Sequence, residues 1–403
     1  MEQDARPEVV TPRAKRALAL MGFALVVLAA SAGAYLSRSA NHPYNGPPPP
    51  PTSRPVLISM TSTSQRQLWL IVHDSGGPES FLFHTDDGGA HWRRQLSMSG
   101  PGILHFADAR RGVLLNYPFG PQPEAVVPHV FATADAGAHW RPVTMPRLSL
   151  GSNASPFFLD PERGWVLGNR AAPRGGPVAE EHTLWRTRDG GHLWEALVNV
   201  DAVQPLDHGV SGADLISGIG FRDPDDGWMV TLGDAASSAV YVTHDGGRNW
   251  TRSSIAGALP GSAGQFFLGL PSVSKDGRGM MSVFDRGANQ FSVLGTSDGG
   301  DSWGGLQTVP TAGTLNSAFV DGSVAWVANG SAAWVTANSG GSWLRSAALP
   351  GGLALGTVAP VDASVAWVQG LKYRAQSDPL SWMLFRTTDA GRHWKSVAAP
   401  SLS

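Results

Sequence analysis

Cysteine is absent from this sequence of 403 residues, and charged side chains make up only 15% of it. Without cysteine the chain has no disulfide, no thiolate metal site, no cysteine nucleophile and no lipidated cysteine anchor. From Val56 onward 24 basic and 29 acidic side chains leave a slightly negative net charge. A nucleic-acid partner is therefore not expected, because binding to phosphates requires a basic surface.

Turn-forming and aromatic residues are abundant by contrast, with Gly 49, Pro 30 and Trp 15. This composition differs from that of a helical bundle or a disordered chain and favours an all-β protein. The length exceeds that of a typical domain but suits one large repetitive β domain.

One long apolar run lies near the N-terminus, where residues 17–36 read ALALMGFALVVLAASAGAYL without a charge. Twenty helical residues suffice to cross a hydrocarbon core of about 30 Å. Residues 1–16 are therefore predicted to be a cytoplasmic leader and 17–36 a transmembrane signal-anchor helix. The positive-inside rule gives this orientation because three basic residues precede the run closely and one follows it; they are Arg13, Lys15, Arg16 and Arg38.

A cleaved signal peptide is the alternative interpretation, and it would make the protein secreted. Ala30-Ser31-Ala32 and Ala32-Gly33-Ala34 both fit a small-residue cleavage site. We favour the anchor because the apolar run continues past both sites. Residues 37–55 are proline-rich and are predicted to form a semi-rigid polyproline II spacer, with a proline-rich recognition ligand as the alternative.

The rest of the chain is repetitive. The pattern Thr-x-Asp-x-Gly-x-x-Trp, here called the box, occurs seven times, beginning at Thr85, Thr133, Thr187, Thr243, Thr296, Thr336 and Thr387. The intervals of 48, 54, 56, 53, 40 and 51 residues match one four-stranded propeller blade. A turn followed by a large apolar residue precedes each box, at Trp69, Val113, Trp165, Trp228, Met280, Trp326 and Trp367.

These repeats predict that residues 56–403 form a seven-bladed β-propeller with four-stranded antiparallel blades. Each blade reads strand A, tight turn, strand B, variable loop, strand C, box and strand D. The short fifth interval, of 40 residues, predicts that the sixth blade is trimmed. The first repeat begins with strand A and the last ends with strand D, so no spare strand is evident for closing the ring by strand exchange.

Each box position has a structural role. Glycine allows positive φ, Asp and Thr can bond nearby backbone N–H groups, and Trp covers the hairpin and packs between blades. We assign these roles to the third box residues Asp87, Asp135, Asp189, Asp245, Asp298, Asn338 and Asp389. The last box residues are Trp92, Trp140, Trp194, Trp250, Trp303, Trp343 and Trp394.

These motifs resemble the Asp-box, or BNR, repeats of sialidases and related propellers. The combination of a turn with Gly-Trp and a following Thr-x-Asp-Gly-Gly-x-x-Trp resembles most specifically the photosystem II assembly factors of the Ycf48/HCF136 type. The resemblance covers essentially all of Val56 to Ser403. It implies a propeller fold and a role in assembling or stabilising membrane complexes.

The sequence predicts no catalytic, cofactor or metal site. Resemblance to sialidases would imply an Arg-Ile-Pro motif, three arginines and a Tyr-Glu pair, but no glutamate pattern accompanies the propeller tyrosines Tyr117, Tyr241 and Tyr373. No box offers more than two acids, too few for a calcium loop, and no His-x-x-x-His zinc pair occurs. Phosphate-binding and dinucleotide-binding glycine motifs are also absent.

Antiparallel strand order places the A–B turns and the boxes on one face, called the box face, and the long loops on the other, called the loop face. The A–B arginines Arg110, Arg111, Arg163 and Arg278 form either a basic rim or solvated turns. Loops on rigid scaffolds often bind partners. The candidate binding residues on the loop face are Tyr117, Arg170, Arg174, Glu181, His208, Lys372, Tyr373 and Arg374.

This mixed set suits a protein or a glycan, although the loops could equally be variable linkers without a partner. We therefore predict a monomeric, non-catalytic, membrane-anchored extracytoplasmic interaction scaffold. A glycan-active enzyme or lectin of the sialidase-like class is the alternative.

Overall fold

The computed structural model describes residues 55–118, 127–149, 152–171, 180–234, 238–255, 259, 265–312, 316–372 and 381–402. The chain divides into the units Met1–Pro49 and Pro50–Ser403, and every described residue belongs to the second. The predicted leader, signal-anchor and nearly all of the spacer therefore lie outside the described residues. Among the residues that are described, no helix is long and apolar enough to cross a membrane.

The described chain is all-β, as predicted, and contains five four-stranded antiparallel sheets. Two are β1(Pro55–Ser62) to β4(Arg93–Ser99), with β2(Leu68–Asp74) and β3(Glu79–Thr85), and β5(Gly102–Phe106), β6(Gly112–Asn116), β7(His129–Thr133) and β8(Arg141–Val143). The third is β9(Asn153–Phe158), β10(Gly164–Ala171), β11(Glu180–Thr187) and β12(Glu195–Val200). The last two are β24(Asn316–Phe319), β25(Ala325–Ala328), β26(Ala333–Thr336) and β27(Leu344–Arg345), and β28(Ala354–Pro360), β29(Ala366–Lys372), β30(Ser381–Thr387) and β31(Lys395–Val397). One short 3-10 helix, η1(Pro350–Gly352), precedes β28.

A nine-stranded sheet stands where two separate blades were predicted. It joins β15(Leu215–Phe221), β16(Gly227–Asp234), β17(Val240–Thr243) and β18(Thr251–Arg252) to β19(Gln265–Leu268), β20(Ser272–Val273), β21(Gly279–Asp285), β22(Gln290–Thr296) and β23(Gly304–Ala312). The pairing of β16 with β17 ends at Val230↔Val240, which leaves the end of β16 open on that side. Strand β19 fills this place through Leu232↔Phe267 and also pairs with β21. The hairpin β13(Leu206–Asp207) and β14(Val210–Ser211) forms a separate two-stranded sheet.

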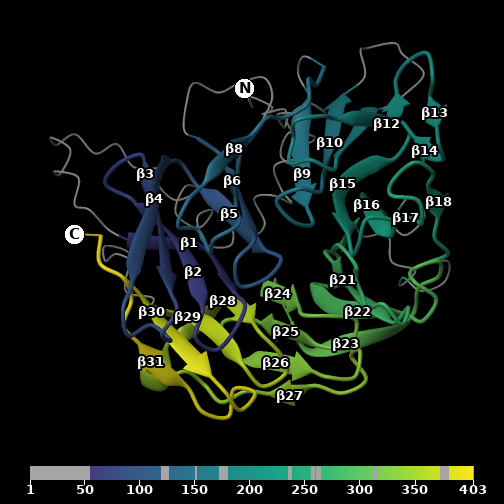
Figure 1. The fold of residues 1–403 in the computed structure, drawn as a ribbon. Helices are drawn as coiled ribbons and strands as arrows, with labels where there is room; N and C mark the ends of the chain where they lie inside the picture. The colour runs from purple at the N-terminus through teal and green to yellow at the C-terminus, as the bar shows by residue number, and fades with distance from the viewer. Residues whose placement is uncertain are drawn as a thin grey trace, which may run out of the picture. The chain divides into compact units, whose positions relative to one another are not determined.

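The hydrophobic core lies between successive sheets. Trp69 of β2 stacks on Phe106 of β5 at 3.8 Å between ring centroids, and Trp165 of β10 stacks on Phe221 of β15 at 3.6 Å. The last sheet packs on the first in the same way, since buried Trp367 shares a cluster with Leu57. Strands β1 and β28 are in contact, and Figure 1 shows the yellow β28–β31 sheet beside the purple β1–β4 sheet.

The trimmed blade predicted from the 40-residue interval is present. Strands β24, β25 and β26 have four residues each and β27 has two. Strands β25 and β26 are joined by the tight turn Asn329–Ala332, in which the Ala332 N–H donates to Asn329 Oδ1. The interval is therefore short because its strand B to strand C loop is reduced to a turn.

Candidate functional site

The seven boxes share one hydrogen-bond pattern, made by the threonine hydroxyl and the side chain of the third residue. The threonine hydroxyl donates to the third residue and accepts the N–H of the fifth, as in Thr85 to Asp87 Oδ1 at 2.9 Å and Gly89 N to Thr85 at 2.9 Å. The third side chain also accepts the N–H of the seventh residue, His91 in this box. Asn338 replaces Asp in the sixth box and makes the same bonds through its Oδ1. These polar side chains therefore build turns.

Each box lies beside the A–B turn of its own strand set, as strand order predicts. The N–H of the fourth box residue donates to an A–B carbonyl in all seven repeats, for example Gly88 to Arg66 at 2.9 Å and Ala390 to Ser364 at 2.8 Å. The A–B aspartates are also structural, since Asp108 Oδ1 accepts the N–H groups of Arg110 and Arg111. Three of the four candidate rim arginines pair with an aspartate of their own turn, namely Arg111 with Asp108, Arg163 with Asp160 and Arg278 with Asp276.

Acid should destabilise the protein by protonating the box aspartates. The N–H of His139 and then its imidazole lower the pKa of Asp135 to about 2. A carboxylate with a depressed folded-state pKa stabilises the fold above its unfolded value, near 4, and this contribution disappears as pH falls towards 2. We expect melting temperatures to drop steeply between pH 4 and pH 2.5. Asp135→Asn, which copies the sixth box, should lose less stability over this interval than the unchanged chain; equal losses would contradict the assignment.

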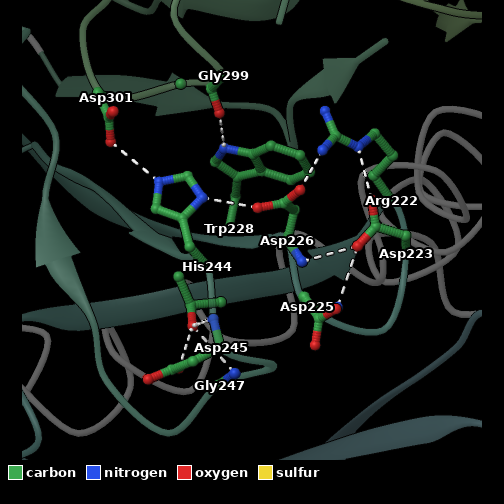
Figure 2. A network of polar contacts seen from close by, with 12 residues as sticks. Arg222, Asp223, Asp225, Asp226, Trp228, His244, Asp245, Gly247, Gly299 and Asp301 are labelled. Carbon is green, nitrogen blue, oxygen red and sulfur yellow. Dashed lines mark hydrogen bonds and ion pairs between the residues drawn. The ribbon is translucent and has the colours of Figure 1, made fainter. Parts of the chain in front are cut away.

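A charged network links the box of β17–β18 to that of β22–β23 (Figure 2). His244 lies between two carboxylates, with Nδ1 2.6 Å from Asp226 and Nε2 3.2 Å from Asp301. Asp226 also pairs with Arg222. The hydrogen bond to Asp226 is the main cause that raises the pKa of His244 above 6.5. The imidazolium therefore bridges two repeats.

The His244 bridge should stabilise the protein only while the imidazole is protonated. Because the folded-state pKa is raised, its contribution is complete below the unfolded pKa and vanishes as pH rises through the folded pKa. His244 is half exposed, so we expect His244→Gln to cost less than about 1 kcal/mol at pH 5.5 and nothing at pH 9. Urea unfolding at both pH values measures this. His91→Gln is the matched control, because it breaks a pair within a single box. A cost of His244→Gln that is the same at both pH values would refute the bridge.

The candidate loop-face residues are distributed over several sheets. Arg170 at the end of β10 pairs with Glu181 of β11. Tyr117 follows β6, where its N–H donates to Pro101 and burial raises the pKa of its hydroxyl, and Lys372 ends β29 in an exposed position. Arg174, Tyr373 and Arg374 lie outside the described residues. The structure therefore brings together one pair of the set.

The placement of His208 on the loop face is wrong. His208 occupies the β13–β14 turn with φ +48°, and its carbonyl accepts the N–H of Trp250, the last residue of a box. Its imidazole lies 3.3 Å from Asn249 of the same box. The chain between β12 and β15 folds back towards the box because this hairpin forms, and the sequence pattern gave no signal for it.

A buried polar cluster beside the Arg170–Glu181 pair was missed by sequence reasoning. His182 of β11 is fully buried, with Nδ1 2.9 Å from Asn169 Oδ1 and Nε2 3.1 Å from the Asp214 carbonyl. The Tyr241 hydroxyl donates to the Asp214 carboxylate, so this tyrosine does have an acidic partner. Burial lowers the pKa of His182 to about 4, and burial followed by the bond to Asp214 raises that of Tyr241.

The His182 and Tyr241 side chains cannot contact a substrate directly, because Tyr241 is 3% exposed and His182 0%. Its polar groups satisfy one another between two strand sets. The available signal was the run of polar residues from Glu180 to Thr183 inside a strand whose neighbours are apolar. Among the described residues no group of three or more His, Cys, Asp or Glu side chains could hold a metal ion.

Comparison with known proteins identifies two kinds of relative. The chain is 26% identical over 259 residues to the chloroplastic photosystem II stability/assembly factor HCF136 of Cyanidioschyzon merolae, covering 50% of this chain and 54% of the relative. It is 24% identical over 387 residues to a xyloglucanase of Paenibacillus sp., covering 82% of this chain and 33% of the relative. The chain thus spans about half the length of one curated relative and a third of the other. No family model matches the sequence.

Solved structures include the same two kinds of protein. YCF48 bound to D1 peptide aligns with a TM-score of 0.49 and 16% identity, over 79% of this chain and 91% of that one. The GH74 enzyme of Niastella koreensis aligns with a TM-score of 0.38 and 12% identity, over 84% of this chain and 65% of that one. The chain is therefore similar both to an assembly factor and to glycoside hydrolases.

Proposed function

We propose that this protein is a non-catalytic seven-bladed propeller that binds a protein partner through its loop face. The supporting observation is the engagement of its polar groups: the box and A–B turn carboxylates accept backbone N–H bonds, and the His182 and Tyr241 side chains are buried. Glycoside hydrolysis needs two accessible carboxyl groups several ångströms apart. Similarity to an assembly factor over half of the chain points in the same direction.

The count of seven blades follows from the seven boxes, with β15–β18 and β19–β23 taken as two blades joined through β19. Residues 17–36 anchor the protein, and the propeller lies outside the cytoplasm as a monomer. Protease treatment of intact and opened cells, with N-terminal sequencing of the membrane-bound protein, tests this arrangement. A mature N-terminus just after Ala32 or Ala34 would replace the anchor with a cleaved signal.

In situ crosslinking tests the protein partner. A photo-crosslinking amino acid at Tyr117, on the loop face, should yield a discrete adduct, and the same group at exposed Thr251 in β18 is the control. Shortening the segments 119–126 and 172–179 should abolish the Tyr117 adduct without changing the melting temperature. Adducts of equal yield at both positions, or no reproducible adduct, would refute the loop-face assignment.

A glycan-active function is the second candidate, favoured by the similarity to a xyloglucanase across 82% of the chain. The purified propeller should be assayed for hydrolysis of xyloglucan and sialosides and for binding to a glycan array. Release of sugar, with loss of the loop-face adduct when the sugar is added, would favour this candidate over the protein scaffold.

A further inference from the structure

In the β9–β12 sheet the carboxylate of Glu195 lies between two arginines, one from the same sheet and one from the next box. Arg186 of β11 lies directly opposite Glu195 of β12 in the register. Its Nη2 is 2.6 Å from Glu195 Oε2, and Nη2 of Arg248, from the next box, is 3.1 Å from Oε1. Arg186 also donates to the Gly246 carbonyl at 3.2 Å. A glutamate side chain is therefore the natural ligand of this arginine pair.

The same register position in the last sheet lacks the carboxylate. Arg386 of β30 lies opposite Lys395 of β31. Its guanidinium lies 5.2 Å from the centroid of the Trp367 ring and donates to the Gln65 carbonyl at 2.5 Å, which matches the position of Arg186 against its neighbouring sheet. Like charges placed directly opposite each other on a sheet are destabilising. An anion bound between Arg386 and Lys395 would therefore stabilise this pair by offsetting the repulsion between their positive charges.

A comparable pair in the first sheet avoids the repulsion. His84 lies opposite Arg93, but burial lowers the pKa of His84 to about 4, so that the imidazole is neutral. Arginine and lysine side chains, by contrast, both stay positively charged at neutral pH. At the corresponding C–D positions of the described strands, only Arg386 and Lys395 are two permanent cations.

A shallow depression of about 170 Å³ lies over this pair, lined by Arg386, Thr388, Asp389, His393, Trp394 and Lys395. The Asp389 carboxylate is already engaged, since Oδ1 accepts the His393 N–H and Oδ2 lies 2.6 Å from the His393 imidazole. Among the described residues no acidic side chain pairs with Arg386 or Lys395. The depression is well below the roughly 300 Å³ of a small-molecule pocket, but it can admit one acidic side chain.

We propose that Arg386 and Lys395 bind the carboxylate of a glutamate or aspartate side chain on a partner protein, as Arg186 and Arg248 bind Glu195 within the chain. This site extends the proposed protein-binding function to a corner of the box face. The open, exposed position of Lys395 on an outer strand suits an approaching protein surface. The partner carboxylate supplies the charge that the internal repeat carries in its own strand D.

Binding of a fluorescein-labelled hexaglutamate peptide, measured by anisotropy at low salt, tests the site, with hexaglutamine as the neutral control. We expect Lys395→Glu to weaken hexaglutamate binding by at least about fivefold, because the new carboxylate occupies Arg386 itself. Lys275→Glu makes the same charge change at an exposed lysine of a distant A–B turn and should leave binding within about twofold. Lys395→Glu should also melt at or above the temperature of the unchanged chain.

Three results would overturn the proposal. They are equal affinity of Lys395→Glu and the unchanged chain, equal losses for Lys395→Glu and Lys275→Glu, and binding of free acetate or glutamate as tight as that of the peptide, which would make this a small-anion site. A loop-face adduct without any hexaglutamate binding would remove this site and leave the proposed function intact. Absence of both would remove the proposed function as well.

Discussion

Trp165→Ala is expected to lower the free energy of unfolding by about 3–5 kcal/mol, the range for truncating a buried aromatic side chain. Trp165 is 1% exposed and stacks on Phe221 of the next strand set, with an angle of 7° between the rings. Its indole N–H donates to the Gly246 carbonyl at 3.0 Å, inside the neighbouring box. Its truncation therefore removes packing and a hydrogen bond at the same inter-sheet seam. Equilibrium unfolding in urea measures the loss.

Trp165→Phe is the matched control, because it keeps an aromatic ring on Phe221 and removes the indole N–H. The Gly246 carbonyl would still accept from Arg186, so we expect a cost of only about 1–2 kcal/mol. Equal costs for the two variants would mean that the hydrogen bond, and not packing, holds the seam. A cost below 1 kcal/mol for alanine would show that these two strand sets are not tightly coupled.

The tryptophans ahead of the boxes made the seams predictable, since one residue type recurs at one place in five repeats. The indoles of Trp69, Trp165 and Trp228 all donate to the carbonyl of the fourth residue in the next box. Val113 and Met280, which replace tryptophan, lack such a donor. Local chemistry repeated in phase was therefore sufficient to predict strand order, turn type and the face shared by boxes and A–B turns.

Features formed by a single pair of distant segments were not predictable. The pairing of β19 with β16 depends on where β17 starts, and the fold-back at His208 depends on a hairpin that no other repeat has. The contact between Tyr241 and Asp214 joins two residues 27 positions apart with no pattern to connect them. The Arg386–Lys395 pair became informative only when strand register showed that Glu195 occupies the matching place.

The fifth box position shows how such tertiary contacts determine a glycine. The fourth residue has positive φ in every box, yet it is alanine or serine in three, Ala136, Ser339 and Ala390. The fifth is always glycine. A Cβ there would meet a side chain of the neighbouring repeat, at 2.1 Å from Val397 for Gly89, 2.2 Å from Gln95 for Gly137 and 2.3 Å from Trp228 for Gly300. Space, in addition to φ, therefore excludes a side chain.

Gly89→Ala should consequently weaken the seam where the two ends of the propeller meet, by about 2–5 kcal/mol from left-handed strain plus overpacking. None of the described strands is shared across this seam. Besides packing, it depends on bonds such as Trp92 Nε1 to Ala398 at 2.8 Å and Trp367 Nε1 to Ser64 at 3.3 Å. Unfolding in urea gives the cost, and faster cleavage by protease in native buffer would report an opened ring.

Two further variants separate the backbone strain of alanine at positive φ from the steric clash between its Cβ and Val397. Gly299→Ala places alanine at φ +81° with no atom closer than 4.0 Å, so it should cost only the strain of about 1–2 kcal/mol. Val397→Ala removes the methyl group that would clash with the new Cβ of Gly89→Ala. In the double variant Gly89→Ala, Val397→Ala, the part of the unfolding free-energy cost that exceeds the cost of Gly299→Ala should therefore be recovered, through a coupling energy of about 1–3 kcal/mol. If the costs of Gly89→Ala and Val397→Ala simply add in the double variant, the destabilisation by Gly89→Ala arises within the box itself. Recovery would show that the glycine is there because Val397, 308 residues away in the sequence, occupies the space of its side chain.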